Sequence, residues 1–166
     1  MLDQAAFALL YETEATAVFN YARYRVGPDE EADAASDAFA RAWSRRSTYD
    51  PSRGVPKAWL WAIVRTTVAD VAVRRARPSQ SRFVPNLNLD RVQTAAPDPE
   101  SDLLWEVIEA SRALKPVDRE ILALRFGAGL AHRSIAEYLG LSEANVAQRL
   151  RRALDRLREV LSEEPT

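Results

Sequence analysis

Side chains able to read base-pair edges gather on one flank of a predicted helix near the end of the chain. They recur at three- and four-residue steps, which brings them together at 100° per residue: Asn145, Gln148, Arg149, Arg152 and Arg156. Asn and Gln can make paired hydrogen bonds to adenine, Arg can do so to guanine, and all of them can reach phosphates. The flank therefore indicates binding of duplex DNA, with a merely solvated Arg-rich face as the alternative.

Carboxylates mark one face of another predicted helix, within residues 30–43. This face carries residues at three- and four-residue spacing: Glu30, Asp33, Asp37 and Arg41. The other face, which we expect to face the core, carries apolar residues: Ala32, Ala35, Phe39 and Trp43. Like charges at this spacing cost a little helix stability, which a basic partner would offset. The alternative is an acidic face that contacts only water.

A third polar pattern lies on the predicted helix over residues 56–77. Its members form a strip on a largely apolar helix: Thr66, Asp70, Arg74 and Arg77. Packing of the apolar positions can hold such a helix rigid while one edge touches DNA. Trp59 and Trp61 could stack on bases, but they interleave with aliphatic residues, so we expect both rings in the core.

The chain offers little for bond chemistry or for a bound metal. It has no Cys, one His and five Gly, and none of the glycines forms a nucleotide-binding loop. The lack of Cys excludes disulfides, thiolate metal sites and cysteine nucleophiles. We expect no enzyme activity, no metal and no cofactor, and we assign no role to His132.

Helical signals dominate the sequence. In the first part they predict helices over residues 3–25, 29–47 and 56–77, separated at Gly27-Pro28 and at Tyr49-Asp50-Pro51. In the last part they predict helices near residues 101–113, 117–127, 132–139 and 142–162. No alternating strand pattern is present, so the predicted fold class is all-α.

The last two predicted helices form a helix-turn-helix. Gly140 supplies the turn, and Ser142 is the expected N-cap of the second helix. That helix carries one apolar stripe: Val146, Leu150, Ala153, Leu154, Leu157 and Leu161. Because helix, turn, cap and basic flank occur together, duplex binding is favoured over a solvated face.

Two small helical domains are predicted, over residues 1–77 and 101–166. The segment between them, residues 78–100, contains four Pro and two Asn without helical periodicity, as is typical of a linker. No apolar run approaches the roughly 18 residues of a membrane helix, and the start of the chain carries acids where a secretion signal carries Lys or Arg. We therefore expect a cytoplasmic protein without membrane insertion.

The net charge of −1 conceals a strong local asymmetry. Residues 1–50 hold nine Asp or Glu against five Arg, whereas residues 51–77 hold six Lys or Arg against one Asp. Residues 145–158 hold five Arg, again against one Asp. Two basic patches in an otherwise acidic chain suit a protein that meets DNA in places and another surface elsewhere.

The C-terminal block resembles region 4 of bacterial sigma factors. The resemblance lies in a Leu-Pro-containing turn with an Arg-Glu pair, an Ile-Ala pair and an Arg-x-x-Arg-Ala run: Leu114, Pro116, Arg119, Glu120, Ile135, Ala136, Arg149, Arg152 and Ala153. Taken alone, this block is also similar to the DNA-binding domain of LuxR-type response regulators. The N-terminal block must decide between the two families.

The N-terminal block resembles sigma region 2. A Tyr-Asp-Pro-Ser-Arg-Gly turn, residues 49–54, leads into a Trp-Leu helix with a polar edge and a basic end. The matching helix positions are Trp59, Leu60, Arg65, Thr66, Asp70, Arg74, Arg75 and Arg77, and the preceding helix matches at Asp33, Asp37 and Phe39. Together the two blocks identify the chain as similar to sigma factors of the small extracytoplasmic-function (ECF) type.

This resemblance implies partners and site residues. Core RNA polymerase would bind one set: Asp33, Ser36, Asp37 and Arg41. Promoter DNA would bind another: Arg65, Thr66, Asp70, Arg74, Arg75, Arg77, Asn145, Gln148, Arg149 and Arg152. The first block would dock and, with the loop at residues 49–55, capture an unstacked base of the minus-ten element, while the second reads the minus-thirty-five element. An anti-sigma factor is also implied.

Two positions depart from the family pattern. Thr66 stands where the family usually has Asn, and Ser36 stands where it usually has Gln, so base capture and docking each lose an amide. Two other functions remain open from the sequence. One is a helix-turn-helix regulator that acts without core polymerase, and the other is a helical interaction protein without promoter activity.

Overall fold

In the computed structural model, which describes residues 1–27, 30–75 and 106–163, every regular element of these ranges is a helix. The chain divides into two compact units, one holding the described residues up to 75 and the other those from 106 on. The prediction of two small all-α domains is confirmed. The predicted domain boundaries, and the linker at 78–100, lie outside the described residues and stay predictions.

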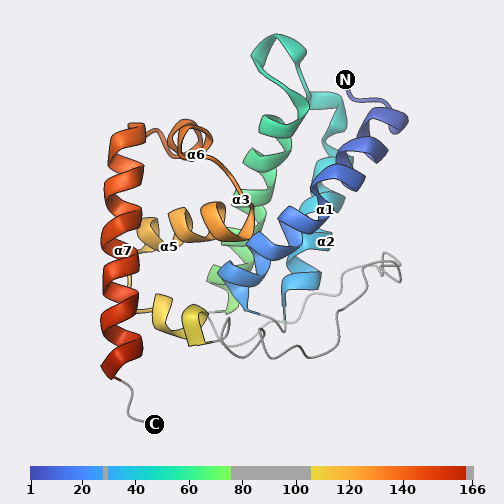
Figure 1. Cartoon of the computed structure of the whole chain (residues 1–166). Helices are drawn as coiled ribbons and strands as arrows, with labels where there is room; N and C mark the ends of the chain where they lie inside the picture. Colours follow the sequence, from blue (N-terminus) through green and yellow to red (C-terminus); the bar gives the residue numbers. More distant parts are fainter. Residues whose placement is uncertain (28–29, 76–105, 164–166) are drawn as a thin grey trace. The chain divides into compact units, whose positions relative to one another are not determined.

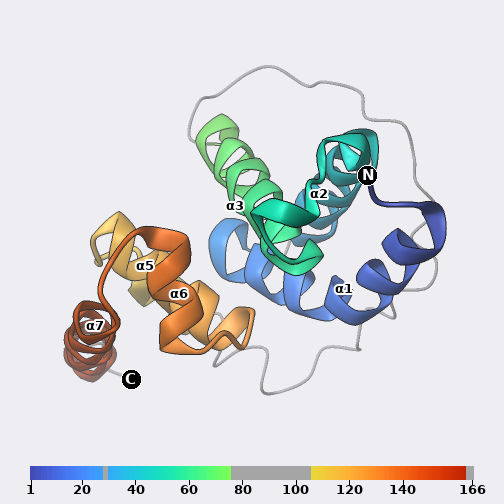
Figure 2. The same cartoon turned by 90° about the horizontal axis from the view of Figure 1, so that it is seen from above.

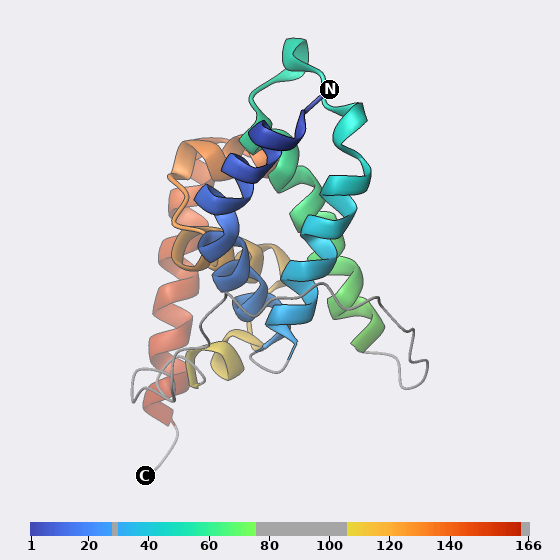
Figure 3. The same ribbon diagram turned by 90° about the vertical axis from the view of Figure 1, so that its right-hand side faces the viewer.

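Three helices form the first unit: α1 (Gln4–Val26), α2 (Glu31–Ser44) and α3 (Pro56–Arg75). Each packs against the other two, and their ribbons run side by side in Figures 1 and 3. Figure 2 shows the same three helices from above, around a shared centre. Asp3 caps α1 by accepting the N–H of Ala6 at 2.8 Å, and Gly27 ends it at φ 89°, where a Cβ is disfavoured.

The core of the first unit takes one face from each helix. Tyr21 and Trp61 are fully buried and meet edge to face, with ring centroids 5.5 Å apart. The predicted burial of Trp61 is therefore confirmed. Trp59 is only half-buried, because it packs against Tyr49 of the connection before α3, with ring centroids 5.9 Å apart.

One carboxylate lies inside this core. Glu14 of α1 is buried, and its Oε2 accepts the indole N–H of Trp61 at 3.0 Å. Its Oε1 lies 3.0 Å from Nζ of Lys57. A buried carboxylate is costly unless it is paired and hydrogen-bonded, and here both oxygens have partners. The contact fixes the start of α3 against α1.

The core face of α2 is wider than the sequence pattern predicts. Ala35 and Phe39 are buried as expected, but Ala32 is exposed and Trp43 is 39% exposed. Alanines at positions 34, 38 and 42 are fully buried instead. The reason is that α2 packs against α1 and α3 at once, and small residues four apart allow a neighbouring helix to approach closely.

The second unit contains helical residues 106–111, α5 (Pro116–Leu122), α6 (His132–Leu139) and α7 (Glu143–Glu163). The helix predicted over 117–127 is confirmed in its extent, but its last part is not α-helical. After α5 the backbone widens into a π turn, η3 (Ala123–Gly127), in which the N–H of Ala128 donates to the carbonyl of Ala123 at 3.0 Å. Glycines at positions 127 and 129 weaken a continuing helix there.

The second core lies where α5 and α6 pack on α7. Residues from each of them are fully buried: Ile121, Leu124, Ile135 and Val146. The predicted stripe of α7 is buried at Val146, Leu150, Ala153 and Leu157, while Leu154 is half-buried and Leu161 is 36% exposed. Gly140 joins α6 to α7 at φ 65°, the left-handed conformation that favours glycine.

Candidate nucleic-acid and protein interfaces

The acidic face of α2 presents its predicted residues unequally. Asp33 is exposed, and it makes no hydrogen bond or ion pair with its side chain to residues 1–27 and 30–75. Ser36 is half-buried, and its hydroxyl donates to the carbonyl of Ala32 at 2.8 Å, one turn earlier. Asp37 and Arg41 are also half-buried, because they lie at the contact with α3. Of the four candidates, Asp33 is the most accessible to a partner.

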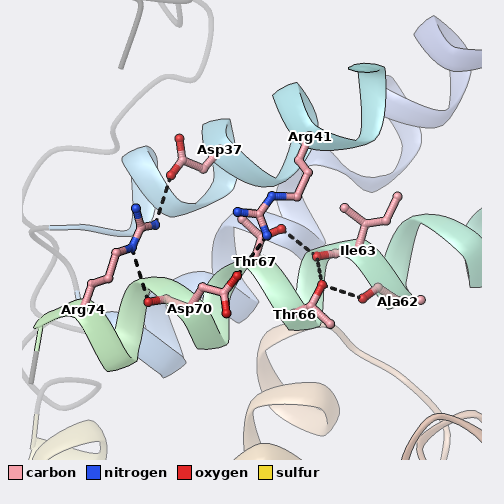
Figure 4. Close-up of polar contacts among 8 residues, drawn as sticks. All are labelled: Asp37, Arg41, Ala62, Ile63, Thr66, Thr67, Asp70 and Arg74. Carbon is pink, nitrogen blue, oxygen red and sulfur yellow. Dashed lines mark hydrogen bonds and ion pairs between the residues drawn. The ribbon is translucent and has the colours of Figure 1, made fainter. Parts of the chain in front are cut away.

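Two ion pairs join α2 to α3 (Figure 4). We call the four residues that form them the α2–α3 ladder: Asp37, Arg41, Asp70 and Arg74. Nη1 of Arg41 lies 2.9 Å from Oδ2 of Asp70, and Nη2 of Arg74 lies 3.5 Å from Oδ2 of Asp37. The members of each helix are four residues apart, so antiparallel helices place each acid opposite an Arg. The structure thus joins two predicted polymerase-binding residues to two predicted DNA-binding residues.

The polar edge of α3 is accessible beside the ladder. Thr66 is exposed, and its hydroxyl lies 3.2 Å from the carbonyl of Ala62 and 2.9 Å from that of Ile63 (Figure 4). A hydroxyl that donates to its own helix keeps acceptor lone pairs for a partner. Thr67 is fully buried, so only one of the two adjacent threonines belongs to the edge.

The other predicted DNA-binding residues of α3 differ in how exposed their side chains are, and not all of them lie within the described residues. Arg65 is half-buried, and the side chains of Asp70 and Arg74 are 59% and 56% exposed. Arg75 ends α3, and Arg77 lies outside the described residues. The described part of the predicted strip, from Thr66 to Arg74, therefore faces outward along a single edge of the helix.

The loop before α3 is held in shape by its own polar groups. It contains two short turns, η1 (Arg46–Thr48) and η2 (Pro51–Arg53). Oδ1 of Asp50 accepts the Oγ–H of Ser52 at 2.8 Å and its N–H at 2.9 Å, and these bonds lower the pKa of Asp50 below its ordinary value. The hydroxyl of Tyr49 donates to the carbonyl of Gly54 at 3.0 Å, which closes the loop.

The second unit presents the predicted base-reading flank on α7. Ser142 caps the helix as predicted, because its Oγ accepts the N–H of Asn145 at 3.1 Å. Gln148 and Arg152 are exposed, whereas Asn145 and Arg149 are half-buried. Arg156 is exposed and pairs with Glu159 at 2.9 Å. The flank is therefore continuous in space but unequal in accessibility.

Arg149 is held inside the unit by two partners. Its Nη1 lies 3.0 Å from Oδ1 of Asp118, in the first turn of α5, and its Nε donates to Oδ1 of Asn145 at 2.9 Å. The Arg149 side chain is 33% exposed and that of Asp118 is 17% exposed. Sequence reasoning missed Asp118, because a contact across 31 positions leaves no periodic signal.

The fold and these surfaces define a class: a helical protein with a charged three-helix unit and a separate helix-turn-helix unit. Two family models match the chain in the same order. Sigma-70 region 2 matches residues 10–78, and Sigma-70, region 4 matches residues 112–159. No helix within the described ranges is long and apolar enough to cross a membrane.

Curated relatives extend the match to nearly the whole chain. The ECF RNA polymerase sigma factor RpoE of Cereibacter sphaeroides is 29% identical, over 96% of this chain and 88% of the relative. SigK of a Mycobacterium species is 26% identical, over 96% of this chain and 84% of the relative, and it is also named an ECF RNA polymerase sigma factor. The similarity therefore covers both units together.

Two solved structures share the fold. CnrH, in complex with the cytosolic domain of CnrY, has a TM-score of 0.71 at 24% identity and covers 98% of this chain and 92% of its own. The sigma factor RpoE from Bartonella quintana, in complex with the anti-sigma factor NepR, has a TM-score of 0.65 at 22% identity. That match covers 96% of this chain and 98% of the solved one.

The chain belongs to the ECF sigma factors of bacterial RNA polymerase. Members of this family bind core RNA polymerase and direct it to promoters, and this is the function of the present chain. A helix-turn-helix regulator would account for residues 112–159 but not for the region 2 match over 10–78. The two departures at Ser36 and Thr66 therefore occur within the family.

Proposed function

We propose that the two units divide the work of promoter recognition. The unit of α1, α2 and α3 docks on core polymerase through the exposed side of α2 and opens the minus-ten element with the edge of α3 and the loop before it. The unit of α5, α6 and α7 binds the minus-thirty-five element as duplex. The chain itself makes and breaks no bonds, and the catalysis remains with the polymerase.

The observation that carries this proposal is the α2–α3 ladder. Because Asp37 pairs with Arg74 and Arg41 with Asp70, the acidic side of α2 adjoins the polar edge of α3. Asp33 lies one turn beyond the Asp37–Arg74 end of the ladder, and Thr66 lies one turn beyond the Arg41–Asp70 end. The ladder would therefore join a polymerase surface that covers Asp33 to a DNA strand that touches Thr66. One rigid unit then couples docking to strand opening, and extrusion of a base, which costs a few kcal/mol, is offset by contacts already in place.

Thr66 limits the kind of contact available at the opened strand. Its single O–H points at carbonyls of its own helix, so the hydroxyl offers a partner only acceptor lone pairs, where an amide would offer a donor and an acceptor. Since that hydroxyl already lies against the carbonyl of Ile63, its natural role is to accept a hydrogen bond from a base amino group or from a water. We infer a less selective capture at this position than an Asn would give.

We further propose that the chain works in the cytoplasm and that an anti-sigma factor controls it. Of the two solved neighbours, RpoE was co-crystallised with the anti-sigma factor NepR, and CnrH was solved in complex with the cytosolic domain of CnrY. Each unit has an exposed charged residue that an anti-sigma factor could cover: Asp33 on the first unit and Arg152 on the second. The sequence contains no Cys, so the oxidation of a thiol in this chain cannot control its activity.

Run-off transcription tests the central proposal. Purified core polymerase is supplied with a promoter library, with and without the chain, and the transcripts are sequenced from their 5′ ends. Specific start sites that depend on the chain are expected. DNA binding without initiation would favour a polymerase-independent regulator, and neither activity would favour an interaction protein.

A further inference from the structure

The contacts of Arg149 assign it a role different from base reading. Arg presents guanine with two N–H groups from one edge of its guanidinium. In this structure Nε is bound to Asn145 at 2.9 Å and Nη1 to Asp118 at 3.0 Å, and the side chain is only 33% exposed. These two bonds use two of the five N–H groups of the guanidinium, and Nη2 is left for another partner. Because Nε and Nη1 hold the half-buried group in place, Arg149 is better suited to orient Asn145 than to present a freely moving edge to guanine.

The same contacts fix the amide of Asn145. Nε of Arg149 can only donate, so the amide atom facing it is Oδ1, and the nitrogen Nδ2 lies on the other branch. No hydrogen bond to another described residue uses Nδ2. Ser142 holds the backbone of Asn145 at the same time. The side chain and the backbone of Asn145 are thus both oriented before DNA binds.

This orientation changes what Asn145 can recognise. The paired contact with adenine needs Oδ1 to accept from the base amino group while Nδ2 donates to N7. Arg149 takes one of the two lone pairs of Oδ1, and its positive charge makes Oδ1 a weaker acceptor for a second donor and Nδ2 a stronger donor. The amide therefore acts mainly as a donor. Guanine, which offers O6 and N7 as acceptors in the major groove, suits such a donor better than adenine does.

We propose that Asp118 and Arg149 are positioning residues for promoter recognition, which orient Asn145 as a hydrogen-bond donor toward the duplex. The inference rests on the proposed function of the second unit, and it adds which base that unit prefers at one position of the promoter. Asp118 holds the guanidinium, the guanidinium holds Oδ1 of Asn145, and direct reading falls to Asn145, Gln148 and Arg152. Asp118 thereby affects promoter choice from α5 without touching DNA.

The test measures base preference with the full chain assembled on core polymerase. A library randomised across the minus-thirty-five element is selected by initiation, and Asn145→Ala first identifies the base pair that Asn145 reads. The wild-type chain is expected to prefer guanine there. Asp118→Asn keeps the shape but removes the charge that holds Arg149, and Arg149→Lys keeps the charge but cannot bridge both partners.

Both variants should shift the preference at that base pair toward adenine by about tenfold, within the discrimination of one paired base contact. Other positions should be unaffected. The double variant should shift the preference no further than either single one, since both break the same chain of contacts. Glu137→Gln on α6 is the matched control, because it also removes one negative charge that pairs with an Arg of the same unit, here Arg133. It should leave every preference unchanged.

Three results would overturn the inference. One is a wild-type preference for adenine at that base pair. The second is an unchanged preference in Asp118→Asn while Arg149→Lys loses a guanine at some other position, as expected of a direct reader. The third is that both variants lose initiation on every promoter sequence and also unfold at lower midpoints than the wild-type chain. That result would indicate a structural role for both residues. Absence of specific initiation by the wild-type chain would instead refute the proposed function itself.

Discussion

At the scale of single residues, the charges of α2 are not equivalent. Asp37 and Arg41 already have partners on α3, so a substitution there disturbs the unit as well as any docking surface. Asp33 is exposed, and its side chain has no partner among the residues that the structure describes. An effect of Asp33 on polymerase binding can therefore be separated from an effect on folding.

Charge reversal by Asp33→Lys should weaken association with core polymerase by about tenfold, because one favourable charge contact becomes a repulsive one. Fluorescence anisotropy of the labelled chain, titrated with core enzyme at two salt concentrations, measures the change. Glu12→Lys on α1 is the control, since Glu12 is also exposed and acidic. Equal affinity for wild-type and Asp33→Lys chains would remove Asp33 from the docking surface.

At the scale of elements, the α2–α3 ladder joins two helices through partly exposed charges. Such pairs typically stabilise a protein by only about 0–1 kcal/mol, because water screens them. Burial of apolar residues such as Leu60, Val64 and Phe39 supplies most of the packing energy between the helices. We therefore expect the ladder to matter more for the placement of charges than for stability.

A charge swap separates these two roles. Arg41→Asp and Asp70→Arg should each lower the free energy of unfolding by about 0.5–1 kcal/mol, and the double swap should restore most of it. Urea unfolding followed by circular dichroism gives these values. Promoter opening, followed by the fluorescence of 2-aminopurine in the minus-ten element, should remain impaired in the double swap, because the charges facing DNA are still exchanged. Recovery of full opening would mean that the pair serves only to hold α2 against α3.

At the scale of the whole molecule, we expect the length of the predicted linker, residues 78–100, to limit which promoters the chain can use. The two promoter elements lie about two helical turns apart, on the order of 70 Å. Fully extended, residues 78–100 can span roughly 75 Å at about 3.3 Å per residue. The reach barely exceeds the distance, so we expect the segment to be nearly extended when both elements are bound.

Deletion of eight residues within 78–100 would remove roughly 26 Å of reach. The shortened chain should bind core polymerase as well as the wild-type chain does, yet lose most initiation at promoters with the natural spacing. Replacement of the same eight residues by a Gly/Ser sequence keeps the length and should retain initiation. Transcription across a series of promoter spacings provides the measurement. Undiminished activity of the shortened chain would show that the two elements need not be bound together.

The sequence by itself determined the helices, the two-unit division and the family. Pro, Gly and capping residues act within a few positions of each helix end, so Gly27 and Ser142 could be placed without a structure. The cap at Asp3 was not predicted. The stripe of α7 was equally readable, because one apolar face packed on two helices follows the 3.6-residue period. Motifs such as the turn at residues 49–54 are contiguous and need no tertiary information.

Only the tertiary structure decided which charged residues remain available to partners. The ladder, the burial of Glu14 and the contact between Asp118 and Arg149 each join helices that are distant in sequence. Periodicity assigns a residue to a face, but it does not say what packs against that face. For this reason α2 buries a wider face than predicted. Likewise Arg149, which we expected to read bases, is bound to residues of its own unit.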